Sequence, residues 1–185
     1  MKPVHANRFL FLFLATLFLQ ASCQSSTQTT KAPLQTNQSP SPTDSLPKSV
    51  GYVNDFENLY TIEEQKHLDE LITEFEDATT VQMALVSIPA YFIKNGNIDD
   101  YTLQLGRTWG VGRKDKNNGI LIGISSELRH MRIQNGTGIE TILSNAETKR
   151  IVDSFFIPEF KKGNYYAGTL KGIQEVMKTL KEKLK

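Results

Sequence analysis

A polar loop that leads into an apolar stretch carries the residues whose chemistry is easiest to name. Residues 111–125 read VGRKDKNNGILIGIS and place Asp115, Asn117 and Asn118 directly before the apolar run. Carboxylate and amide oxygens are the ligands that hard cations such as Ca²⁺ and Mg²⁺ take. A lone aspartate needs further carboxylates from elsewhere in the chain, and the segment NDFEN, with Asp55 and Glu57, is one source.

The same loop has a simpler interpretation as a polar turn. Asn118 and Gly119 form a pair that bends a chain, and Asp115 is a residue type that accepts hydrogen bonds from nearby backbone amides. The segment fails the EF-hand pattern, because its glycine comes one position early and position twelve is Ser126 rather than glutamate. Residue chemistry alone leaves the turn and the cation site both open.

The usual catalytic constellations are absent from the sequence. The histidines are His5, His67 and His130, with no zinc-ligand spacing among them, and the helix and strand positions of the last two favour surface or structural roles. The segment GVG at 110–112 lacks the third glycine of a dinucleotide fingerprint, and GRK lacks the spacing of a P-loop. The sequence therefore offers no obvious nucleophile or phosphate cradle.

The N-terminus is typical of an export signal of the lipoprotein type. Lys2 and Arg8 precede an apolar run from Phe9 to Leu19, which is shorter than the roughly 20 residues of a membrane-spanning helix. Small residues then precede Cys23, the only cysteine. This arrangement resembles the bacterial lipobox, although Gln20 stands where an aliphatic residue is usual. We predict a signal over residues 1–22 and lipidation of Cys23, with plain secretion as the alternative.

Residues 23–49 are predicted to join the lipid anchor to a folded domain. The segment is rich in Ser, Thr, Gln and Pro, and Leu34 and Leu46 are its only large apolar side chains. Such a composition buries too little apolar area to offset the entropy of ordering, so we predict a disordered tether. The formal net charge of the chain is +1, and loss of Lys2 and Arg8 with the signal lowers it by two. Near-neutrality gives no support for nucleic-acid binding.

Hydrophobic periodicity predicts one α/β domain over residues 50–185. The predicted order is helix, strand, helix, strand, strand, helix, helix, and the fourth and fifth elements form a hairpin. Helices that alternate with apolar strands imply a small mixed sheet sandwiched between helices. The ranges are a helix over 61–79, a strand over 81–88, a helix over 99–109, strands over 119–125 and 129–136, a helix over 146–156 capped by Asn145 and disturbed by Pro158, and a last helix over 166–184.

Several segments in this order resemble the TPM domain family over roughly residues 50–180. The combination of LGRTWGVGRKDKNNGILIGIS with RHMRIQNGTGIETILSN carries most of the resemblance. It implies an α/β sandwich outside the cytoplasm, often tethered to a membrane. A plant member is associated with acid phosphatase activity and photosystem II repair, and some bacterial members are thought to bind divalent cations.

The resemblance also implies a polar cluster in this chain. Its members would be Asp55, the run Asp115 to Asn118, Arg132 as an anion-binding candidate, and Asn145, where the family commonly has an acidic residue. The missing carboxylate at Asn145 weakens a Ca²⁺ or Mg²⁺ site. Alternatively, Arg132 is a strand arginine that forms an ion pair and does not bind an anion.

Two main functions are consistent with the sequence. The first is a membrane-tethered accessory module that assists assembly or maintenance of bacterial envelope proteins, bound to an unknown envelope partner and expected as a monomer. The second is a metal-dependent acid phosphatase that acts on small phosphomonoesters. A purely structural domain is the third alternative.

Overall fold

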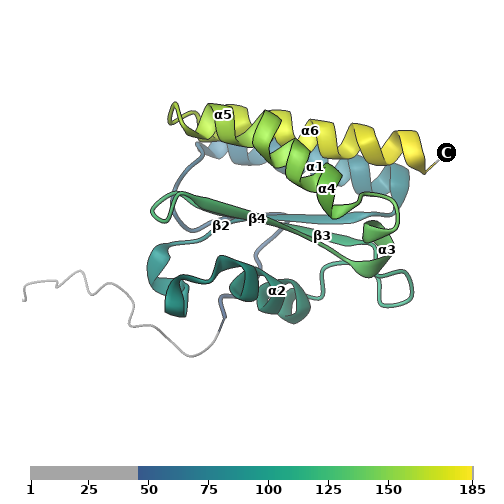
Figure 1. Ribbon diagram of the computed structural model, residues 1–185, viewed down its shortest axis with the longest axis horizontal. Helices are drawn as coiled ribbons and strands as arrows, with labels where there is room; N and C mark the ends of the chain where they lie inside the picture. Colours follow the sequence, from purple (N-terminus) through teal and green to yellow (C-terminus); the bar gives the residue numbers. More distant parts are fainter. Residues whose placement is uncertain (1–45, 185) are drawn as a thin grey trace, which may run out of the picture. The chain divides into compact units, whose positions relative to one another are not determined.

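The computed structural model describes residues 46–184, which form four strands and the helices that cover them (Figure 1). The predicted signal, Cys23 and most of the predicted tether lie outside the described residues. Within residues 46–184, no helix combines the length and the apolar character needed to span a membrane.

The sheet is mixed, as predicted. Its strand order is β1-β2-β3-β4, with β1, β2 and β3 parallel and β4 antiparallel to β3. Every residue of β3 is buried, which explains its unbroken apolar sequence. The strands are β1 (Val53–Asp55), β2 (Gln82–Ser87), β3 (Gly119–Ser125) and β4 (His130–Asn135).

Helices cover both faces of the sheet, which confirms the predicted sandwich (Figure 1). One face packs against α1, α4, the π-helical turn η3, α5 and α6, and the other packs against α2. The helical elements are α1 (Ile62–Thr79), the 3₁₀ turns η1 (Ala90–Phe92) and η2 (Lys94–Gly96), α2 (Ile98–Trp109), α3 (Thr137–Glu140), α4 (Asn145–Ile151), η3 (Val152–Phe156), α5 (Ile157–Phe160) and α6 (Tyr165–Lys183).

Helix α4 differs from its prediction in its cap and its end. Ser144, not Asn145, is the N-cap, and it forms a capping box with Glu147. The predicted helix over 146–156 becomes a π turn after Ile151, in which the N–H of Ile157 donates to the carbonyl of Val152. Pro158 follows in the first turn of α5, where its lack of an N–H is tolerated.

Helix α6 has two buried glycines that admit aromatic rings from the preceding segment. A Cβ atom at Gly172 would lie 2.0 Å from the ring of Phe156, and one at Gly168 would lie 2.7 Å from the ring of Phe160. Phe156 is fully buried. The two glycines therefore let η3 and α5 pack directly on α6.

This packing predicts opposite effects for two glycine substitutions inside helices. Gly172→Ala should lower the free energy of unfolding by about 1–3 kcal/mol, because the methyl group overlaps the Phe156 ring. Gly106→Ala in α2 is the matched control, since its Cβ would meet nothing closer than 3.8 Å and alanine favours helix by about 1 kcal/mol. Urea unfolding, followed by the fluorescence of the single tryptophan Trp109, measures both. Equal stability of the two variants would contradict the packing.

Candidate functional site

The loop before β3 is held by the buried side chain of Asn118. Its Oδ1 accepts a hydrogen bond from the backbone N–H of Arg113 at 2.9 Å, and its Nδ2 donates to the carbonyl of Thr80 at 2.6 Å. Gly119 must be glycine, because a Cβ there would lie 2.1 Å from the carbonyl oxygen of Val111. Asn118 therefore ties the loop to the end of α1, and its amide oxygen is already used by a backbone donor.

The other polar residues of this loop lie on its exposed side. Asn117 has a positive φ of 47°, and its carbonyl accepts from the N–H of Gly138 at 3.1 Å. Asp115 is exposed and has no hydrogen bond or ion pair within the described part of the chain. The loop thus presents one free carboxylate to solvent.

Asp55, at the end of β1, organises a different set of backbone groups. Its carboxylate accepts from the N–H groups of Leu59 at 3.0 Å and Tyr60 at 2.9 Å, and from the hydroxyl of Ser87. Ser87 in turn accepts from the N–H of Glu57 at 2.8 Å. These bonds join the ends of β1 and β2 and hold the entry to α1, so they use the oxygens of Asp55 inside the protein.

Glu57 continues this network to the β3–β4 turn. Its two carboxylate oxygens accept from the N–H of Ser126 at 3.1 Å and 3.0 Å, and the Ser126 hydroxyl adds a further bond at 3.0 Å. Burial raises the pKa of Glu57, and the hydrogen bonds from Ser126 oppose that rise. Glu57 is a structural link between loops in this arrangement.

The predicted proximity of Asp55 to Asp115 is wrong. Asp55 pairs with Ser87, which pairs with Ile124 near the end of β3, whereas the loop of Asp115 precedes Gly119 at its start. The six residues from Gly119 to Ile124 span about 16 Å of strand. Because the strands are parallel, a residue at the end of β1 and a loop that precedes β3 lie at opposite ends of the sheet.

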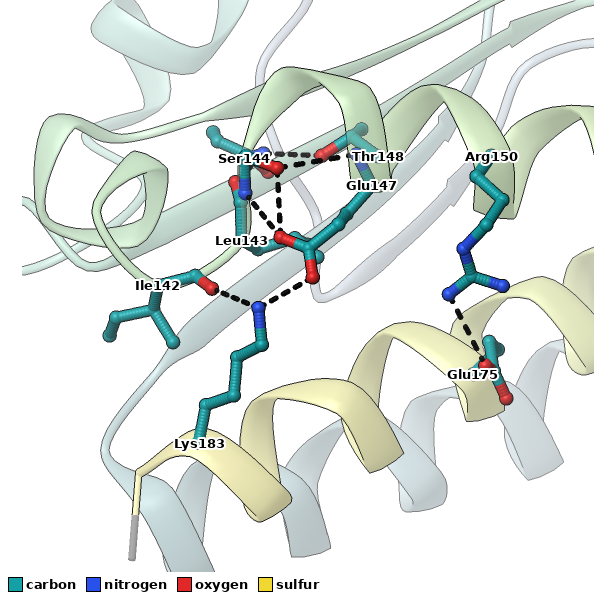
Figure 2. Close-up of polar contacts among 9 residues, drawn as sticks. Ile142, Leu143, Ser144, Glu147, Thr148, Arg150, Glu175 and Lys183 are labelled. Atoms are coloured by element: carbon teal, nitrogen blue, oxygen red, sulfur yellow. Dashed lines mark hydrogen bonds and ion pairs between the residues drawn. The ribbon is translucent and has the colours of Figure 1, made fainter.

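Asn145 lies at the start of α4, at the same end of the sheet as the Asp115 loop. Its side chain is exposed, and the polar contacts of this helix start belong to its neighbours (Figure 2). Lys183 from α6 donates to Glu147 at 2.6 Å and to the carbonyl of Ile142 at 2.9 Å. The bonds from Lys183 and Ser144 lower the pKa of Glu147 to about 2. A fixed ion pair, rather than Asn145, therefore organises this corner.

Arg132 lies in the middle of β4, opposite Gly123, and so apart from both polar loops. Its Nε is 3.9 Å from a carboxylate oxygen of Asp99 in α2, and both side chains are about half exposed. This is the strand ion pair that the sequence left as the alternative to anion binding. An exposed pair of this kind contributes about 0–1 kcal/mol.

The residues expected to hold Ca²⁺ or Mg²⁺ do not fit a cation site together. Asp55 and Asn118 bond to protein donors, and Asp115 supplies the one free carboxylate of its loop. Within residues 46–184, no group of three or more His, Cys, Asp or Glu side chains converges as metal ligands do. Hard cations need several oxygen ligands, largely anionic ones, so this donor set matches no all-protein site for them.

A basic groove that the sequence did not reveal lies beside the same loop. The groove has a volume of about 450 Å³ and runs between α2, residues 110–114 and the end of β4. Arg107, Arg113 and Lys114 line it, and no aspartate or glutamate does. Among the described residues these three cations have no acidic partner. The two arginines and the lysine on either side of the turn GVG were visible in the sequence, but their convergence depends on how the turn packs.

The comparisons with known proteins place this fold in a family. The TPM domain model matches residues 53–179, which is most of the chain, and the chain belongs to the TPM domain family. No match was found among the curated proteins.

Solved structures of similar domains agree with this assignment. The N-terminal domain of a protein from P. gingivalis is 29% identical with a TM-score of 0.66, over 72% of this chain and 83% of that one. The BA42 protein from the psychrophilic bacterium Bizionia argentinensis is 21% identical with a TM-score of 0.58, over 69% of this chain and 85% of that one. The N-terminal domain of the cg2496 protein from Corynebacterium glutamicum is 15% identical with a TM-score of 0.52, over 74% and 84%. The last two show the shared fold alone.

Proposed function

We propose that this chain is a membrane-tethered binding module of the bacterial envelope that recognises anionic groups through the basic groove. The tether would begin at a lipidated Cys23 and place the TPM domain outside the cytoplasm. Its role would be accessory, in the assembly or maintenance of envelope proteins. One observation carries the binding role: three cationic side chains line a groove that contains no carboxylate.

The chemistry of the groove favours phosphoryl or carboxylate groups as ligands. The guanidinium groups of Arg107 and Arg113 can bond such an anion through two N–H groups each, and Lys114 adds a point charge. Because no acidic side chain lines the groove, an anion meets no like charge there. All three side chains are exposed, so salt should weaken the attraction.

The alternative function is a metal-dependent acid phosphatase. The basic groove would also suit its substrates, small phosphomonoesters. Hydrolysis further requires a nucleophile or an activated water. The hydroxyls that line the groove belong to Thr102 and Thr137, and that of Thr102 already bonds to the carbonyls of Ile98 and Asp99 at 2.8 Å and 3.1 Å. No histidine lines the groove. Binding without turnover is therefore the better-supported function.

The groove can be tested on the chain from Gln24 to Lys185, which contains every described residue. Phenyl phosphate should shift the amide resonances of residues 106–114 and 134–137 saturably. Arg113→Ala should weaken its binding about tenfold, which corresponds to ~1.4 kcal/mol. Lys116→Ala is the matched control, because Lys116 lies in the same loop, outside the groove, with its Nζ 3.4 Å from the hydroxyl of Thr80.

Two outcomes would contradict the binding role. If both variants lost binding equally, the loss would reflect nonspecific electrostatic attraction to the loop and not a specific site in the groove. Turnover of the phosphate ester in the presence of Ca²⁺ or Mg²⁺, lost on Asp115→Ala without unfolding, would favour the phosphatase instead.

The tether is tested separately by cell fractionation. The full chain should appear with the membranes and take up radiolabelled palmitate, and Cys23→Ala should abolish the label and release the protein. A membrane-bound Cys23→Ala protein would contradict lipid anchoring at this residue. Since the groove lies wholly within the described domain, its own test is unaffected by this result.

A further inference from the structure

A second cavity lies at the opposite end of β3 from the basic groove. It has a volume of about 480 Å³ and opens between the β3–β4 turn, α5 and the start of α6. This volume is within the range of about 300–1,000 Å³ that is usual for small-molecule sites. The cavity shares no residue with the basic groove.

A large part of the wall of this cavity is apolar. Ile124 and Met131 contribute from the sheet, while Ile157, Phe160 and Tyr165 contribute from the helical side. The rings of Phe160 and Tyr165 pack with their centroids 5.0 Å apart. Apolar walls of this kind bind the hydrocarbon part of a ligand through the hydrophobic effect.

Helix α5, which lines one side of the cavity, packs closely on α6. Gly168 and Gly172 let the rings of Phe160 and Phe156 lie directly against α6, at distances that a side chain would block. Helix α5 is thereby held on α6 (Figure 1). This close packing fixes the position of the wall that α5 contributes to the cavity.

Two cationic side chains and a histidine accompany the apolar walls. Arg129, His130 and Lys161 line the cavity, all three are exposed, and no aspartate or glutamate lines it. The nearest acidic residue of α5, Glu159, pairs instead with Lys171 at 2.6 Å and Lys162 at 3.4 Å. Glu127 of the turn accepts a bond from the N–H of Ala90, on the side of the sheet that α2 covers. The acidic neighbours are therefore engaged elsewhere.

We propose that this cavity binds a single-chain anionic amphiphile, with its hydrocarbon chain against the apolar walls and its headgroup at Arg129, His130 and Lys161. The combination of enclosed apolar surface and unopposed positive charge matches a fatty acid or a similar monomer better than a purely polar anion. The inference goes beyond the proposed function, because it assigns a second ligand class to a separate site.

Dodecanoate, added below its critical micelle concentration to the chain from Gln24 to Lys185, is a suitable probe. Its binding should shift the amide resonances of residues 124–131 and 157–165 saturably, at lower concentrations than those at which it or acetate shifts the resonances of the basic groove, because only this cavity also takes up the hydrocarbon chain. Acetate tests the headgroup without the chain, and dodecyltrimethylammonium tests the chain with the opposite charge. Both should bind at least about tenfold more weakly than dodecanoate, a difference of ~1.4 kcal/mol or more.

Neighbouring lysines provide a matched pair of variants. Lys161→Gln should weaken dodecanoate binding about three- to tenfold, whereas Lys162→Gln should leave it unchanged because Lys162 does not line the cavity. Arg129→Asn should weaken dodecanoate binding to a similar extent as Lys161→Gln. Asparagine is chosen because it tolerates the positive φ of 51° at this position. Unshifted resonances remote from the cavity verify the fold of each variant.

Several results would overturn the proposal. These are equal weakening by the two lysine variants, equal binding of the cationic amphiphile, or shifts that do not include residues 157–165. Binding to anionic phospholipid vesicles without binding to monomeric dodecanoate would assign this surface to a membrane instead.

Discussion

The pairing of β3 with its two neighbours is the constraint on which the rest of the structure depends. Strand β3 is buried along its whole length, parallel to β2 and antiparallel to β4. A slip of one residue would turn Ile120, Ile122 and Ile124 to the opposite face, so the register is strongly specified. This register decides which loops meet at each end of the sheet, and hence which polar side chains can act together.

Each end of β3 combines a structural network with a basic opening. At its start, Asn118 holds the loop from which Arg113 and Lys114 reach the groove. At its end, Asp55 and Glu57 join three loops through backbone N–H groups, and the cavity beside Arg129 lies next to them along the turn. The buried and half-buried polar residues therefore position the loops, while the exposed basic side chains are free to bind.

Much of the fold could be predicted from local patterns, and the failures have definite physical causes. The helical periodicity correctly predicted α1, whose N-cap Thr61 forms a capping box with Glu64, and the strand patterns predicted β2, β3 and β4. Strand β1 was missed because it has three residues and two of them are polar. The predicted meeting of Asp55 with Asp115 failed because residue types do not show at which end of a sheet a loop lies. The basic groove forms only because Arg107 lies close to the loop of Arg113 and Lys114 in three dimensions, and a local sequence pattern cannot predict that proximity.

A distance measurement between the two ends of β3 tests this arrangement most directly. The chain from Gln24 onward contains no cysteine, because Cys23 is the only one, so Asp115→Cys and Leu128→Cys can carry a pair of spin labels. Double electron–electron resonance should give a main distance of about 20 Å or more, the length of a seven-residue strand. A main distance below about 15 Å would place the Asp115 loop beside the β3–β4 turn, and would contradict the separation of the two proposed sites.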